Sequence, residues 1–199
     1  MNKTRLILFS ILLLSLTSAS ADGRDDLANG DAALDKNEPG PAIGHFTRAI
    51  ESGDLRDEQL GDTYWKRAIA YFDENLDDLH IHHSDRIDGF ESCLENLDAA
   101  LANGKQANAD FDLKSAQCRE YVGLKEEAIG YYLKVLDQDT TTMNRGLSLY
   151  SLGLLYRDLG STDDAELYFG KCTNESDPPS RIAKGCQREL KKMSAQSSS

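Results

Sequence analysis

The chain has 199 residues, with 34 acidic and 22 basic side chains and a net charge of −12 at pH 7. This excess of carboxylates argues against nucleic-acid binding, because neutralisation of phosphates by Lys and Arg supplies most of that affinity. It also disfavours adhesion to anionic lipid headgroups. The acidic surface is either an ordinary solvated surface or a negative groove that attracts a basic partner segment.

Residues 1–21 have the form of a secretory signal peptide. Two basic residues precede an apolar run over 6–16, and an Ala-Ser-Ala cleavage site follows. The run is shorter than the ~20 apolar residues of a membrane helix, which disfavours the alternative of an uncleaved anchor. We therefore expect a mature chain that starts at Asp22, is periplasmic or secreted, and inserts no further segment into a membrane.

Apolar periodicity and turn residues predict a chain that is helical throughout. Short loops rich in Gly, Pro and Asn separate the predicted elements. The Ser-rich end at 196–199 is expected to be disordered. The expected helices span 24–36, 40–52, 57–73, 85–102, 107–121, 125–137, 144–158, 162–173 and 179–193.

The most informative pattern lies in residues 149–172. The spacing L-G-x2-Y-x2-L-G-x4-A-x3-F is followed there by Leu152, Gly153, Tyr156, Leu159, Gly160, Ala165 and Phe169. This pattern resembles the tetratricopeptide repeat (TPR), a helix–turn–helix unit of 34 residues that stacks into a superhelix. Small residues such as Gly153 lie where the two helices of a unit cross, and Phe169 fills the seam with the next unit.

The same slots recur upstream. Gly30 and Ala116 take the slot of Gly153, and second-helix residues follow each of them at the same offsets: Ala42, Phe46 and Ala49, then Ala128, Tyr132 and Val135. In the second unit this pattern lies about thirteen residues late, which predicts an insertion at about 75–88. The resemblance thus implies an all-α fold, a right-handed superhelical solenoid of four repeats with a C-terminal capping helix over 179–193. The repeats are expected near 23–56, 61–103, 109–142 and 146–179.

The insertion holds three of the four histidines of the chain. Its possible metal ligands are His80, His82, His83 and Asp85. On an extended segment His80 and His82 would point the same way, and Asp85 could add a third ligand. The alternative is a solvated polar loop, since no evident helical His pair elsewhere completes a site. We expect no cofactor and no resident metal.

Four cysteines in an exported chain indicate two disulfides, with three possible pairings. In the repeat register Cys172 faces inward in the fourth unit and Cys186 lies on the capping helix, which favours a bond between them. Cys93 takes the crossing slot of the second unit and Cys118 faces that unit from the third. The register therefore also favours Cys93–Cys118.

In TPR arrays the first helices line a concave groove that accepts a peptide or a partner's helix, and the resemblance implies the same here. Trp65, together with Phe72, is either the anchor of such a site or core between stacked helices. Neighbours such as Asp62 and Asp110 give the groove mostly acidic walls. The candidate partner-binding residues are Leu27, Asp31, Trp65, Ile69, Phe72, Leu113, Gln117, Tyr121, Tyr150, Leu154 and Arg157.

The sequence contains none of the motifs typical of hydrolases, P-loop proteins, zinc proteases or dinucleotide-binding enzymes. The leading hypothesis is a non-enzymatic adaptor, a monomer or weak oligomer, that binds a protein or peptide segment in its groove. One alternative is a structural scaffold or self-assembling envelope subunit. Another is a metal-handling accessory protein that uses the histidine insertion.

Overall fold

The computed structural model describes residues 22–77, 83–174 and 180–196. Within these ranges the regular structure is helical, with no strand. The helices are α1 (Gly23–Asp35), α2 (Pro39–Glu51), α3 (Asp57–Asp77), α4 (His83–Ala102), α5 (Ala109–Tyr121), α6 (Lys125–Asp137), α7 (Thr142–Asp158), α8 (Thr162–Thr173) and α9 (Arg181–Gln196). The predicted signal peptide lies outside the described residues. None of the described helices is long and apolar enough to cross a membrane.

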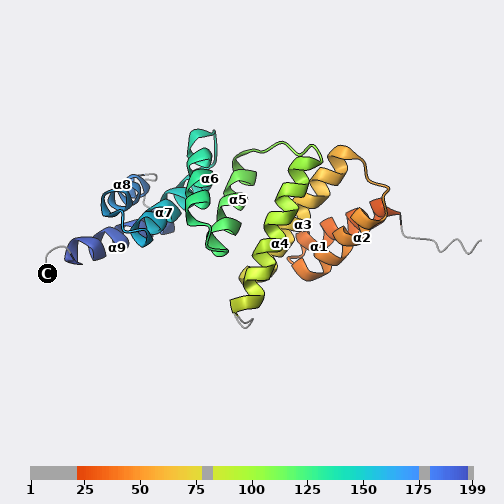
Figure 1. Ribbon diagram of the computed structural model, residues 1–199, viewed down its shortest axis with the longest axis horizontal. Helices are drawn as coiled ribbons and strands as arrows, with labels where there is room; N and C mark the ends of the chain where they lie inside the picture. Colours follow the sequence, from red (N-terminus) through yellow and green to blue (C-terminus); the bar gives the residue numbers. More distant parts are fainter. Residues whose placement is uncertain (1–21, 78–82, 175–179, 197–199) are drawn as a thin grey trace, which may run out of the picture.

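Consecutive helices form antiparallel hairpins that stack into an elongated array (Figure 1). The hairpins α1/α2, α3/α4, α5/α6 and α7/α8 follow one another along the long axis, and α9 packs on the last of them. This architecture confirms the predicted all-α solenoid. A polar side chain caps the start of several helices, as Asn108 does by accepting a hydrogen bond from the Phe111 N–H at 2.9 Å.

The crossing slots explain why the hairpins close so tightly. A Cβ atom added to Gly153 would lie 2.5 Å from the Phe169 ring, and one added to Gly30 would overlap the Phe46 ring in the same way. Both phenylalanine rings are fully buried. Each glycine therefore leaves the space that the aromatic ring of the second helix occupies.

The turns inside the hairpins need a left-handed backbone. Gly123 and Gly160 have φ angles of +86° and +81° and follow the first helices α5 and α7. Asn37 takes the corresponding place after α1, with φ +57°, and asparagine is one of the few other residues that tolerate this region. A residue with positive φ therefore ends the first helix in three of the four hairpins.

The predicted insertion is mostly a pair of helix extensions. α3 and α4 contain 21 and 20 residues, whereas α1, α2, α5 and α6 contain 13 each. The expected end of the third helix at residue 73 was wrong, because the helical packing continues. Asn75 is buried against Gly89 on α4 and donates a hydrogen bond to the Tyr71 carbonyl at 2.7 Å.

This geometry changes the metal hypothesis. His83 and Asp85 lie in the first turn of α4 and not in an extended loop, and His80 and His82 fall outside the described residues. In the part of the chain that the structure describes, no group of three His, Cys, Asp or Glu side chains could hold a metal ion.

Both disulfides join neighbouring structural units. Cys93 on α4 is bonded to Cys118 on α5, and Cys172 on α8 is bonded to Cys186 on α9, with Cα atoms 6.4 and 6.1 Å apart. These are the two pairs that the repeat register favoured. One bond fixes the second hairpin to the third, and the other fixes the capping helix to the fourth.

Candidate partner-binding face

The first helices of successive hairpins lie in a row, and a polar contact ties each of them to the next unit. Lys66 donates to Asp31, Lys105 to Asp62, Asn144 to Asp110, and Arg157 to Glu189 of α9, at 2.7, 2.7, 2.6 and 2.7 Å. Three of the four partners are 32 to 35 residues apart, which is about one repeat. A side chain that donates hydrogen bonds and an acidic side chain about one repeat apart are the sequence signal that could have revealed these contacts.

These ties change the expected electrostatics of the face. The predicted acidic walls included Asp31, Asp62 and Asp110, and each of these carboxylates accepts a hydrogen bond from the next unit along the row. Because the paired side chains of Asp31 and Asp62 are 43% and 44% exposed, each ion pair stabilises the fold by only ~0–1 kcal/mol. Their main effect is to neutralise Asp31 and Asp62, whereas the partner of Asp110 is the uncharged amide of Asn144.

The capping helix covers the C-terminal end of the expected groove. A Cβ atom on Gly185 of α9 would lie 3.6 Å from the Tyr150 ring. Leu154 packs against the cluster that contains Cys186, and Arg157 pairs with Glu189. The predicted partner contacts at Tyr150, Leu154 and Arg157 therefore face α9, which leaves α1, α3 and α5 as the open part of the row.

Several other predicted contacts belong to the core. Phe72 and Leu113 are only 3% and 8% exposed, so they support the face from beneath. Trp65 is partly buried and stacks on Phe111 with ring centroids 5.2 Å apart. One side of the Trp65 ring is therefore part of the core between stacked helices, which was one of its two predicted roles. Leu27 packs partly against the core of the first hairpin.

Four predicted residues lie on α3 and α5, whose side chains meet at the Trp65–Phe111 and Phe72–Tyr121 ring contacts. Together with Lys114 of α5, we call these residues the α3–α5 face: Trp65, Ile69, Lys114, Gln117 and Tyr121. Ile69 and Gln117 are half-buried, whereas Tyr121 is 43% exposed.

The Tyr121 ring is held in place by two buried rings of the second hairpin. It stacks on Phe90 with centroids 4.3 Å apart and meets the edge of Phe72 at 6.0 Å. Tyr121 is thus an aromatic ring that its neighbours hold in place and that stays partly exposed to solvent.

Lys114 is a member of this face that the sequence did not indicate. Its Nζ lies 3.5 Å from the centroid of the Phe72 ring, a cation–π contact. Burial lowers the pKa of Lys114 to about 8, and the nearby Asp73 carboxylate opposes this shift. The face therefore combines a half-buried cation with an exposed aromatic ring.

The low pKa of Lys114 predicts a pH-dependent stability. Between pH 8 and 10.5 the unfolded chain keeps a proton that the folded chain has released, so the free energy of unfolding contributed by Lys114 rises with pH. We expect Lys114→Met to be more stable than wild type at pH 7, by about 1 kcal/mol after allowing for partial exposure.

Urea unfolding of both proteins at pH 7 to 10 tests this expectation. The advantage of Lys114→Met should shrink as the pH rises, because the lysine becomes neutral in the folded wild type. Lys134→Met is the matched control, since the Lys134 ammonium also lies over an aromatic ring, 4.2 Å from the centroid of Tyr131, but is exposed. A wild-type to Lys114→Met difference that stays constant with pH would contradict the burial of a charged amine.

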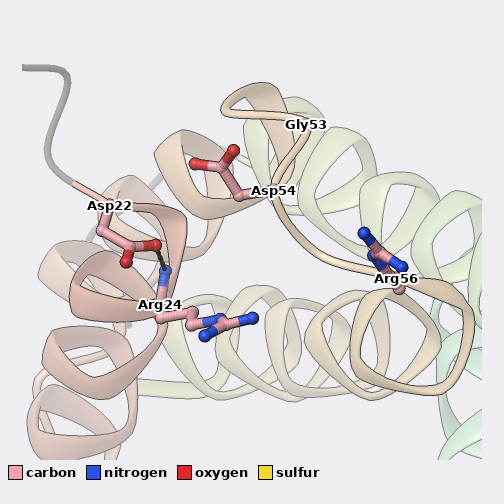
Figure 2. Close-up of a pocket in the computed structure, with 5 residues that line it drawn as sticks. All are labelled: Asp22, Arg24, Gly53, Asp54 and Arg56. Atoms are coloured by element: carbon pink, nitrogen blue, oxygen red, sulfur yellow. Dashed lines mark hydrogen bonds between the residues drawn. The ribbon is translucent and has the colours of Figure 1, made fainter.

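A separate polar pocket of about 560 Å³ lies at the start of α1, lined by Asp22, Arg24, Gly53, Asp54 and Arg56 (Figure 2). Asp22 caps α1 by accepting a hydrogen bond from the Arg24 N–H at 3.1 Å, and Asp54 accepts one from Gly23 at 3.4 Å. The carboxylates of Asp22 and Asp54 thus accept hydrogen bonds from the first turn of α1. They also offset the charge of the Arg24 and Arg56 guanidinium groups in the pocket.

These features define the class of fold, a TPR-like helical solenoid. No protein-family model matches the chain, and no characterised protein matches it by sequence. Among solved structures, the crystal structure of MamA matches with a TM-score of 0.59 and 21% identity, over 78% of this chain and 79% of that chain. A second crystal structure of MamA protein covers 78% of this chain and 92% of that one, at 21% identity and a TM-score of 0.42. At this identity the first match concerns the fold alone.

Proposed function

We propose that this protein is a non-enzymatic adaptor that binds a segment of another protein on the α3–α5 face. The observation that carries the proposal is Tyr121, a large aromatic side chain that is 43% exposed and fixed by stacking on Phe90. Tyrosine is among the residues enriched in binding hot spots, and a ring already held in place loses little conformational entropy when a partner binds.

The chemistry of the face suggests what the partner segment contains. An apolar side chain would pack on the outer side of the Tyr121 ring, and a carboxylate would lie near the Lys114 ammonium, 3.5 Å from the Phe72 ring centroid. The flanking carboxylates Asp31 and Asp62 are already paired with lysines, so they repel such a segment less than the sequence implied.

Photo-crosslinking in the native envelope tests the adaptor role. A photoreactive amino acid at Gln117 should crosslink one defined partner, whereas the same group at Glu126, an exposed position at the start of α6, should not. The affinity of the identified partner is then measured with variants of the face. Equal crosslinking from both positions would reject the α3–α5 face as the binding site.

The Tyr121 ring supplies the quantitative prediction. Tyr121→Ala should weaken partner binding by about 30-fold, the effect of losing a hot-spot side chain of ~2 kcal/mol. Leu167→Ala is the matched control, because Leu167 is also exposed, at 49%, but lies on α8, which packs against α7 and α9. The control should bind within about twofold of wild type, and a Tyr121→Ala variant that does the same would contradict the proposal.

We also propose that the adaptor works outside the cytoplasm. The predicted signal peptide lies outside the described residues, so this part of the proposal draws on the sequence pattern and on the cysteines. All four cysteines of the chain form disulfides, which persist in oxidising compartments such as the periplasm.

A further inference from the structure

The outer side of α9 carries a row of four cations, the basic stripe: Arg181, Lys184, Arg188 and Lys191. All four are exposed, and in the part of the chain that the structure describes none of them makes an ion pair. With Gln187 they line an open depression of about 580 Å³. The opposite side of α9 is occupied, since Cys186 is bonded to α8.

This stripe is unusual in so acidic a molecule. α9 contains five basic residues and one acidic residue, whereas residues 22–180 contain 15 basic and 33 acidic residues. The single acidic residue of α9, Glu189, is buried and already paired with Arg157 and Lys192. The basic stripe is therefore an unneutralised cationic face at one end of an anionic body.

A complementary row lies on the outer side of α4, the acidic stripe: Asp88, Glu91, Glu95 and Asp98. These four carboxylates are exposed, and no ion pair to any of them occurs among the described residues. The opposite side of α4 is core, with Phe90, Cys93 and Leu97 buried. The acidic stripe is thus an available anionic face near the middle of the array.

The two stripes have the same spacing. Successive charges are three, four and three residues apart in both helices, so each stripe is about 15 Å long at 1.5 Å per residue. Because this spacing reads the same in both directions, a parallel or an antiparallel helix pair would place four cations opposite four carboxylates. Figure 1 shows α4 in the middle of the molecule and α9 at its C-terminal end, so the stripes of one chain do not meet.

We propose that the basic stripe on α9 of one copy docks on the acidic stripe on α4 of a second copy. The contact joins two different surfaces, so each copy can bind one neighbour through its basic stripe and another through its acidic stripe. Repetition of this contact gives a ring or an open chain of copies. Exposed ion pairs are individually weak and are screened by salt. The association should therefore be weak and should disappear at high ionic strength. It does not involve the α3–α5 face.

Sedimentation velocity of the full mature chain, with both disulfides formed, tests the proposal. In 20 mM salt the weight-average sedimentation coefficient should rise with protein concentration, and in 500 mM salt the apparent association constant should fall at least tenfold. Lys184→Glu/Arg188→Glu should abolish association at low salt, and so should Glu91→Lys/Glu95→Lys. An equimolar mixture of these two variants should associate again, because the reversed stripes are complementary.

Lys36→Glu/Arg56→Glu is the matched control for Lys184→Glu/Arg188→Glu, since it lowers the net charge by the same amount at exposed positions beside α1 and α3, at the other end of the array from α9. It should associate like wild type. Self-association is overturned if wild type stays monomeric at low salt, if the control loses association equally, or if the mixed variants stay apart. A monomer that instead binds phosphatidylglycerol vesicles through Lys184 and Arg188 would show that the basic stripe recognises anionic lipid, which also overturns the proposal.

Discussion

Phe169→Ala should lower the free energy of unfolding by about 4 kcal/mol, within the range measured for deleting a buried phenylalanine ring. Phe169 is 0% exposed and fills the space that Gly153 leaves at the crossing of α7 and α8. Gly153 has no side chain that could move into the space left by the ring. Urea unfolding followed by circular dichroism measures the effect.

Leu167→Ala serves as the control on the same helix. Leu167 is 49% exposed, and its truncation should change the free energy of unfolding by no more than ~0.5 kcal/mol. If Phe169→Ala lowers the free energy of unfolding by less than about 1.5 kcal/mol, α7 and α8 have moved together to fill the cavity, which would contradict a rigid helix crossing.

A double-mutant cycle isolates the Gly153–Phe169 contact itself. Gly153→Ala alone should destabilise the protein by about 1–3 kcal/mol, because its Cβ would lie 2.5 Å from the ring. In the Phe169→Ala background the same change should be neutral or stabilising, since alanine is the better helix former. Additive effects in the cycle would contradict the direct contact.

Loss of the Cys93–Cys118 disulfide should destabilise the fold by about 3 kcal/mol, as expected from chain entropy for a bond between residues 25 apart. Both sulfur atoms are buried between α4 and α5, so Cys93→Ala/Cys118→Ala also leaves a small cavity at the boundary between the second and third hairpins. Hydrogen exchange should then become faster in α3 to α6.

Cys172→Ala/Cys186→Ala is the comparison variant. This bond joins residues only 14 apart and holds the last helix, so its loss should increase hydrogen exchange mainly in α9, as expected of an array in which each unit contacts only its neighbours. An unchanged urea midpoint after removal of the Cys93–Cys118 bond would contradict its structural role.

The parts of the fold that follow from local spacing could be predicted from the sequence. The offset of sixteen residues from Gly30 to Phe46 and from Gly153 to Phe169 indicates an aromatic ring that packs on a glycine. This contact lies within one hairpin and does not depend on how the hairpins stack. The disulfide pairs followed from the same register. The predicted end of α3 at residue 73 was wrong because Asn75, a poor helix former, is compensated by a buried contact with Gly89 that no local pattern records.

The candidate site was harder to predict, because it depends on how far each hairpin is rotated against the next. Lys114 lies one position beyond a predicted groove slot, and only the packed structure places its ammonium over Phe72. Arg157 occupied a groove slot, but the position of α9 directs it to Glu189. Superhelical geometry, which a single sequence does not specify, decides both outcomes.

The Cys93–Cys118 bond also has a mechanical consequence for the array. No disulfide crosses the boundary between α2 and α3 or the boundary between α6 and α7, where non-covalent contacts and the chain itself join one hairpin to the next. The joint between α4 and α5 is locked by the disulfide, and Tyr121 and its supporting ring Phe90 straddle that joint. We therefore expect any change in curvature to occur at the boundaries without a disulfide, while the surface beside the Cys93–Cys118 bond keeps its shape.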